Sequence, residues 1–143
     1  MDYKIRKLQK NDLKGVSFFE TLSSLRPVED LSFSLSESIF SDCQKRGIEI
    51  YVAESEGLIV GTIRLMFEPK FYHHGKLVAH IEDVSTHEKY QGKGVARSLI
   101  DYAISLCKEK KCYKIILDCD SQLVEFYKKF GFQLDSNCMR INL

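Results

Sequence analysis

Tyr90-Gln91-Gly92-Lys93-Gly94-Val95-Ala96-Arg97-Ser98-Leu99 lies two thirds of the way along this chain of 143 residues. Two glycines flank a lysine, and a run with helical spacing of apolar residues follows. A turn that opens a helix leaves free backbone N–H groups at the positive end of the helix dipole. Gly92 and Gly94 carry no side chain that would keep a ligand away from this backbone. The stretch therefore predicts a binding site for the diphosphate group of a coenzyme.

Two other phosphate-binding motifs do not fit this stretch. A Walker A loop requires GxxxxGK[ST], which is absent here. A dinucleotide fingerprint requires a third glycine at the position that Arg97 occupies, and it normally follows the first strand of a βαβ unit. An ordinary strand-to-helix turn without a ligand remains the alternative interpretation.

The patterns on both sides of the turn predict a mixed sheet covered by helices. Apolar alternation or short apolar runs predict strands, and apolar spacing of three and four residues predicts helices. We expect strands at residues 3–8, 48–54, 58–67, 77–85 and 113–119, and two short final strands at 132–134 and 139–141. We expect helices at 12–22, 36–46 and 122–130 and a main helix from Val95 onward. This order predicts an α/β (α+β) fold with a mixed central sheet, helices on both faces, and a single domain over residues 1–143.

Composition limits the classes of function. The 21 lysines and arginines balance 20 aspartates and glutamates, so no general basic field attracts nucleic acid. No apolar run has the length of a membrane span, and the charged N-terminus lacks a signal-peptide core. The five cysteines include no CxxC pair, which argues against a zinc site or a disulfide framework. We expect a cytoplasmic protein without a metal, a membrane span or a nucleic-acid partner.

Several segments resemble known acetyltransferases. Glu82-Asp83-Val84, followed by Gln91-Gly92-Lys93-Gly94-Val95-Ala96, resembles the acetyl-CoA signature Q/R-x-x-G-x-G/A of the GNAT N-acetyltransferase superfamily. Lys70–His73, Cys112–Cys119 and Phe126–Phe132 are similar to segments of the glucosamine 6-phosphate N-acetyltransferase family. The resemblance implies a GNAT fold and direct acetyl transfer from acetyl-CoA to an amino-sugar phosphate, on the route to UDP-N-acetylglucosamine. It also implies a homodimer with composite active sites and no metal.

The resemblance further implies roles for individual residues. Tyr127 would face the departing sulfur, while Asp118 and Glu82 would face the sugar amine. The implied coenzyme-binding residues are Val84, Gln91, Gly92, Lys93, Gly94, Val95, Ala96, Arg97, Tyr127 and Lys129. The implied sugar-phosphate residues are Ser23, Arg26, Lys70, Phe71, Tyr72, His73, Glu82, Asp83, Tyr113, Lys114, Asp118 and Arg140.

The chain departs from the family pattern at two positions. Leu123 stands where the family often has an asparagine that binds the pantetheine arm. Asn142 aligns with the family's phosphate-binding arginine, and Arg140 lies two residues earlier, which in a strand is the same face. Either Arg140 or Arg26 is therefore the candidate for the phosphate contact.

The chemistry of these residue types agrees with amide formation. A sugar amine with a pKa near ~7.7–8.0 is partly neutral at pH 7, so no strong base is needed. Tyrosine, with a pKa of ~10, can protonate a thiolate, whose thiol has a pKa of ~8.5. A carboxylate such as Asp118 can orient the amine, and a backbone N–H near Val84 can receive the oxyanion.

Each of these assignments has a structural alternative. Tyr127 is otherwise a core aromatic residue, Asp118 a helix cap, and the pair Glu82-Asp83 solvent-facing or bound to Lys114. Cys119 is interpreted as an inert cysteine rather than a nucleophile. Two other functions also remain open. One is acetylation of a protein N-terminus, a lysine or a polyamine, and the other is a non-catalytic acetyl-CoA-binding module.

Overall fold

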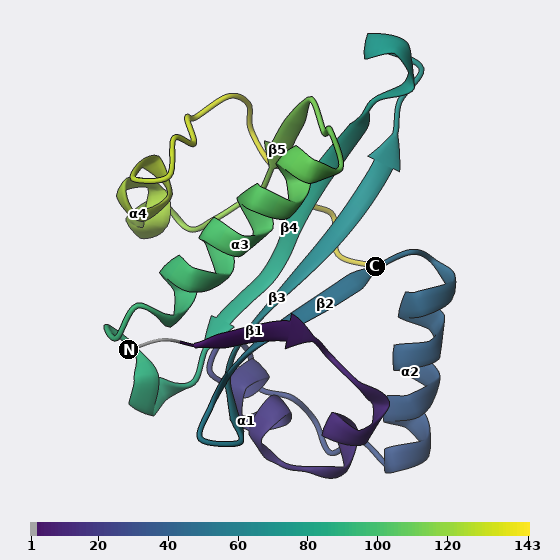
Figure 1. The fold of residues 1–143 in the computed structure, drawn as a ribbon, viewed down its shortest axis with the longest axis vertical. Helices are drawn as coiled ribbons and strands as arrows, with labels where there is room; N and C mark the ends of the chain where they lie inside the picture. Colours follow the sequence, from purple (N-terminus) through teal and green to yellow (C-terminus); the bar gives the residue numbers. More distant parts are fainter. Residues whose placement is uncertain (1–2) are drawn as a thin grey trace.

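The computed structural model describes residues 3–143, which form one five-stranded sheet with the strand order β1-β2-β3-β4-β5. The strands are β1 (Lys4–Lys7), β2 (Glu49–Ser55), β3 (Leu58–Pro69), β4 (Leu77–Thr86) and β5 (Lys114–Ile116). Neighbours from β1 to β4 are antiparallel, and β5 is parallel to β4 (Figure 1). The predicted mixed sheet is confirmed.

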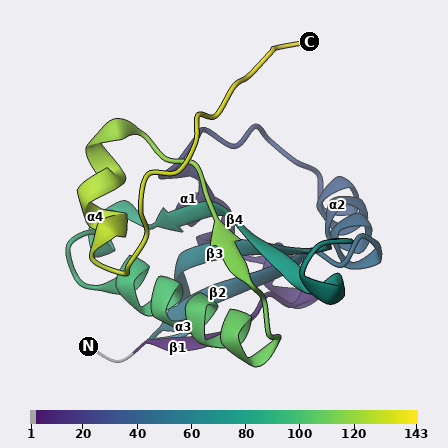
Figure 2. The same ribbon diagram turned by 90° about the horizontal axis from the view of Figure 1, so that it is seen from above.

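Helices cover both faces of this sheet, also as predicted. They are α1 (Ser17–Ser23), α2 (Phe33–Lys45), α3 (Val95–Glu109) and α4 (Val124–Lys128), with short 3-10 helices at Lys10–Lys14, His73–Gly75, Glu88–Tyr90 and Ser121–Leu123. The sheet lies between α1 and α3 when viewed from above (Figure 2). Alternate residues of β2 divide accordingly: Tyr51 and Ala53 join the core under α3, and Val52 joins the core under α1.

The predicted boundaries of the first two helices need correction. Gly15 separates a 3-10 turn from α1, so no continuous helix runs from position 12. Asp12 is the third residue of that turn rather than its N-cap, and its carboxylate accepts the N–H of Gln9 at 2.7 Å. Helix α2 begins earlier than predicted, because the hydroxyl of Ser32 accepts the N–H of Leu35 at 3.1 Å and caps the helix.

The prediction of two final strands at 132–134 and 139–141 is wrong for the single chain. No strand follows Ile116 in the part of the chain that the structure describes, and the last residues run away from the sheet (Figure 2). Met139 is 92% and Ile141 is 82% exposed. A strand needs a partner edge, and these residues pair with no edge of their own chain.

Candidate active site

The central feature of the site is a β-bulge in β4. Arg64 of β3 lies opposite Glu82, whereas Thr62 lies opposite Ser85, so the single intervening residue of β3 faces two residues of β4. Asp83, the first of these two, has a φ of 48°, a value that residues with a side chain seldom adopt. An extra residue of this kind is left out of the hydrogen-bonded ladder. The bulge therefore releases peptide groups at Asp83-Val84 for other partners.

Strands β4 and β5 separate just beyond their short parallel pairing. The pairing covers only Val78–His80 against Lys114–Ile116. Within residues 3–143, β4 has no partner strand on this side from Ile81 to Thr86, so this edge at the carboxyl end of the parallel pair carries no strand ladder. The carboxyl ends of parallel strands are where α/β folds bind ligands. An extended ligand with amide groups can hydrogen-bond to this edge as a further strand would.

The glycine turn lies at the carboxyl end of β4 and opens α3. Gly92 and Gly94 have φ values of 74° and 86°, and an added Cβ at either would have no atom within 4 Å. Gly94 is the N-cap and supplies no side-chain cap. The first intrahelical bond joins Ser98 N–H to Gly94 O at 3.0 Å, so the amides of residues 95–97 have no acceptor within the helix.

Two other groups near the turn contact residues of the protein itself. The N–H of Lys93 is donated to Tyr90 O at 3.3 Å, so it is not a free donor as the sequence led us to expect. The guanidinium of Arg97 stacks over the ring of Phe130, 5.2 Å from its centroid. The exposed turn, its three free amides and this arginine fit a diphosphate group.

Two predicted catalytic carboxylates lie close enough to influence each other. Burial, followed by the negative charges of Asp118 and Asp83, raises the pKa of Glu82, while His80 and Arg64 partly oppose that rise. Glu82 is half-buried and Asp118 is exposed. A carboxylate with a raised pKa beside a second carboxylate suits the orientation and deprotonation of an amine.

Tyr127 faces the same region from α4. Its ring is 8% exposed and makes edge contacts with Phe126 and Phe132, at centroid distances of 5.1 and 5.9 Å. Burial, then the charges of Cys119 and Asp118, raises the pKa of Tyr127. The phenol is therefore protonated at neutral pH and can donate a proton.

Cys119 lies beside Asp118, but its thiol lacks the lowered pKa of a reactive cysteine. Burial, then Asp118 and Asp120, raises its pKa. A thiol with a raised pKa forms little thiolate at neutral pH and is therefore a poor nucleophile.

Most of the predicted sugar-phosphate residues lie elsewhere in the single chain. Lys70–His73 forms the tip of the protruding β3–β4 hairpin (Figure 1), where the ring of His73 stacks on Tyr113 at a centroid distance of 4.1 Å. The five residue steps from Leu77 to Glu82 span roughly 17 Å along β4. The exposed Arg26, Lys114 and Arg140 lie after α1, on β5 and in the C-terminal segment, respectively.

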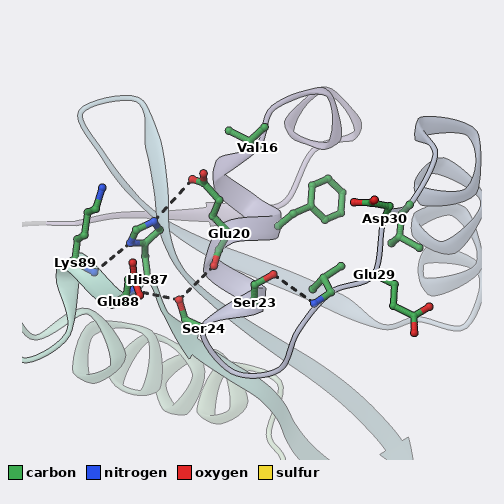
Figure 3. Close-up of a pocket in the computed structure, with 12 residues that line it drawn as sticks. Val16, Glu20, Ser23, Ser24, Glu29, Asp30, His87, Glu88 and Lys89 are labelled. Carbon is green, nitrogen blue, oxygen red and sulfur yellow. Dashed lines mark hydrogen bonds and ion pairs between the residues drawn. The ribbon is translucent and has the colours of Figure 1, made fainter.

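A pocket of about 590 Å³ lies between α1, the loop that follows it and the 3-10 helix Glu88–Tyr90 (Figure 3). Ser23, a predicted substrate residue, lines it and accepts the N–H of Val28 at 3.4 Å. Nε2 of His87 lies 3.8 Å from a carboxylate oxygen of Glu20. The other acidic residues of the lining are Glu29, Asp30 and Glu88. The sequence did not predict this acidic wall, because its members come from segments more than 50 residues apart.

The fold and the comparisons with known proteins together define an acetyltransferase that uses acetyl-CoA. Residues 16–132 match the model of the acetyltransferase (GNAT) family, and the chain belongs to this family. Glucosamine 6-phosphate N-acetyltransferase of Trypanosoma brucei brucei is 34% identical over 145 residues, covering 100% of this chain and 97% of that protein.

Two solved structures show the same fold over nearly the whole chain. The crystal structure of glucosamine 6-phosphate N-acetyltransferase from Arabidopsis thaliana is 31% identical, with a TM-score of 0.91 over 99% of each chain. That of an acetyltransferase from Trypanosoma brucei is 35% identical, with a TM-score of 0.92 over 99% of this chain and 100% of the other.

Two features are absent from residues 3–143. No group of three or more histidine, cysteine, aspartate or glutamate side chains is arranged to hold a metal ion. No helix is long and apolar enough to cross a membrane.

Proposed function

We propose that this protein transfers the acetyl group of acetyl-CoA to the amine of glucosamine 6-phosphate, which yields N-acetylglucosamine 6-phosphate. The observation that carries the proposal is the uncapped first turn of α3 beside the unpaired edge of β4. Two of the glucosamine 6-phosphate N-acetyltransferases to which the chain is similar support the choice of acceptor.

The diphosphate, the pantetheine arm and the thioester of acetyl-CoA each have a suitable binding region in this arrangement. The free amides of residues 95–97 and the side chain of Arg97 would hold the diphosphate. The edge of β4 beyond Ile81 would bind the amide groups of the pantetheine arm. The arm would then lead to the bulge at Asp83-Val84, where a peptide N–H outside the ladder is available to the thioester oxygen.

The residues around the bulge suit the reaction at the sugar amine. The carboxylates of Asp118 and Glu82 accept hydrogen bonds from the amine and place its lone pair toward the thioester. The Val84 N–H stabilises negative charge on the thioester oxygen. As the C–N bond forms and the C–S bond breaks, Tyr127 donates its phenolic proton to the departing sulfur. The proton that the amine loses passes to a carboxylate and, through solvent, restores the phenol. Positioning supplies most of the rate, because the amine is partly neutral at pH 7.

A homodimer would complete the sugar-phosphate site. In the single chain, Lys70–His73 lies at the tip of the β3–β4 hairpin, the C-terminal segment runs away from the sheet (Figure 2), and apolar side chains of residues 134–143 are exposed. Strand pairing of this segment with a second copy would bury these side chains and bring basic residues to a phosphate group. Cytoplasmic location is part of the same proposal, since the five thiols are free.

A steady-state assay of CoA release tests the acceptor. Glucosamine 6-phosphate, glucosamine and the polyamine spermidine are compared at equal concentration. We expect the phosphorylated sugar to have the highest kcat/KM. Glucosamine should have a lower kcat/KM, mainly because its KM is higher. Equal values for the two sugars would contradict the phosphate contact.

One observation favours a second candidate, the acetylation of a cationic amine. The pocket in Figure 3 presents Glu20, Glu29, Asp30 and Glu88, which suit an ammonium group better than a phosphate. Preferential turnover of spermidine in the same assay would support this candidate, and the charge-neutralising variant Glu20→Gln would then lower kcat/KM for spermidine.

A further inference from the structure

Arg64 joins the bulge of β4 to a second layer of the protein. It lies on β3 opposite Glu82, at the point where the register changes. Its Nη1 donates to Oδ2 of Asp83 at 3.2 Å, and its Nη2 donates to Sγ of Cys43 at 3.1 Å. Cys43 belongs to α2 and is 5% exposed. One guanidinium thus connects β3, the bulge and α2.

Asp83 has a backbone conformation that needs external support. Its φ of 48° lies in the left-handed region, which favours glycine and is strained for a residue with a Cβ. Such conformations persist only where the surroundings hold them. Within residues 3–143, the ion pair with Arg64 is the one side-chain interaction of the Asp83 carboxylate.

Packing gives the bulge little support on this side of the sheet. A largely apolar cavity of about 200 Å³ lies between α1, α2 and the sheet, with Arg64 and Asp83 in its wall. An unfilled volume means that the neighbouring side chains make few contacts that could fix Asp83. The hydrogen bond from the guanidinium therefore adds a side-chain restraint on Asp83 to the ladder pairs Arg64–Glu82 and Thr62–Ser85 on either side of the bulge.

The guanidinium holds this position at a cost. Nε of Arg64 is buried and has no hydrogen-bond partner in the described part of the chain. An unpaired buried donor is unfavourable, and each such group in a folded protein calls for an explanation. Each terminal nitrogen donates one hydrogen bond and Nε donates none, so the side chain is oriented for Asp83 and Cys43.

We propose that Arg64 is a positioning residue, which holds Asp83 in its left-handed conformation and so keeps the Val84 N–H directed at the thioester. This role rests on the proposed acetyl transfer. Arginine suits it because a planar fork binds two partners in fixed directions, whereas the single ammonium of lysine does not.

The kinetic test compares Arg64→Met in two backgrounds at saturating substrates. In the wild-type background we expect kcat to fall roughly tenfold, as partial loss of an oxyanion donor would cause. The Kd for CoA, measured by calorimetry, should stay within about twofold, because the diphosphate site on α3 is separate. In the Asp83→Gly background, Arg64→Met should lower kcat by less than about twofold, since glycine adopts a positive φ unaided.

The same tenfold loss in both backgrounds would overturn the proposal, because Arg64 would then act on the substrate or the fold rather than through Asp83. Arg46→Met is the matched control. Arg46 forms an exposed ion pair with Asp42 on α2, and its loss should leave kcat unchanged.

An NMR measurement tests the same role without any substrate. The backbone 13C shifts of Asp83 should show the left-handed conformation in the wild type and lose it in Arg64→Met. Unchanged shifts would overturn the proposal. Should Arg64→Met fail to fold, Arg64→Lys serves in both experiments with the same expectations. A wild type that shows the expected shifts but does not acetylate glucosamine 6-phosphate would contradict the proposed function alone.

Discussion

Gly61 of β3 lies directly beneath Val95, the first residue of α3. A Cβ added to Gly61 would come within 2.3 Å of Cγ1 of Val95 and within 2.9 Å of Cδ1 of Leu99. Real Cβ contacts are never this short, and both neighbours are buried. The missing side chain at position 61 therefore sets how closely the N-terminal end of α3 approaches the sheet.

We predict that Gly61→Ala lowers the free energy of unfolding by about 1–3 kcal/mol, as overpacking of a core does. It should also weaken CoA binding, because the start of α3 is displaced. Urea denaturation and calorimetry with CoA measure the two effects. Gly15→Ala is the control, since its Cβ would meet only Asp12 O at an ordinary 3.7 Å. An unchanged stability in Gly61→Ala would contradict the close approach.

Gly94→Ala tests the diphosphate site in a different way. Its added methyl group meets no protein atom within 4 Å, so the change strains the backbone at φ 86° and obstructs the ligand without a clash in the core. We expect a loss of about tenfold or more in CoA affinity, equivalent to at least ~1.4 kcal/mol.

Acetyl-pantetheine supplies the control for Gly94→Ala, because it carries the thioester but no diphosphate. Its turnover should change much less than that of acetyl-CoA. An equal loss with both donors would show that the turn acts on the reaction centre and not on the diphosphate.

Tyr127→Phe should lower kcat by about 10²-fold, the usual contribution of a positioned proton donor, and leave KM for both substrates nearly unchanged. The ring is retained, so its contacts with Phe126 and Phe132 and the thermal stability should persist. Rapid-mixing kinetics measure the acetyl-transfer step. Tyr102→Phe on α3, where the ring packs 5.0 Å from Tyr51, is the control and should retain full activity. A wild-type transfer rate in Tyr127→Phe would exclude tyrosine as the donor.

The pKa of Glu82 should depend on Asp118. Burial and the Asp118 charge both raise it in the folded protein, so Glu82 takes up its proton at a higher pH than an ordinary glutamate does. For the same reason, kcat/KM should begin to fall at a higher pH on the acid side. As the pH is lowered, Glu82 loses its carboxylate form before an ordinary glutamate does. Asp118→Asn removes the neighbouring charge, and the pKa of Glu82 should then fall.

A 13C NMR titration of the Glu82 carboxyl group measures this pKa directly, apart from any effect of Asp118 on catalysis. Asp120→Asn, which removes an exposed charge two residues further on, is the matched control and should leave the titration unchanged. A rise in the pKa of Glu82 in Asp118→Asn would show that the two carboxylates do not interact as proposed.

The sequence predicted the features that depend on neighbours along the chain. The glycine turn, the helix after it and the strands around positions 50, 62 and 81 each carry a local pattern of apolar spacing or turn residues. The family resemblance likewise rests on short segments, and the family is confirmed. These features were predictable because backbone preference and amphipathic spacing act over a few residues.

Only the tertiary structure decided how distant segments meet. The bulge at Asp83 arises from pairing β4 with β3, and the ion pair with Arg64 joins residues 19 positions apart. The sequence pattern of the final segment predicts strands, yet this segment pairs with no strand edge in the part of the chain that the structure describes. Register, close approach and edge pairing depend on which surfaces remain free once the core has packed, and no local pattern of residues carries that information.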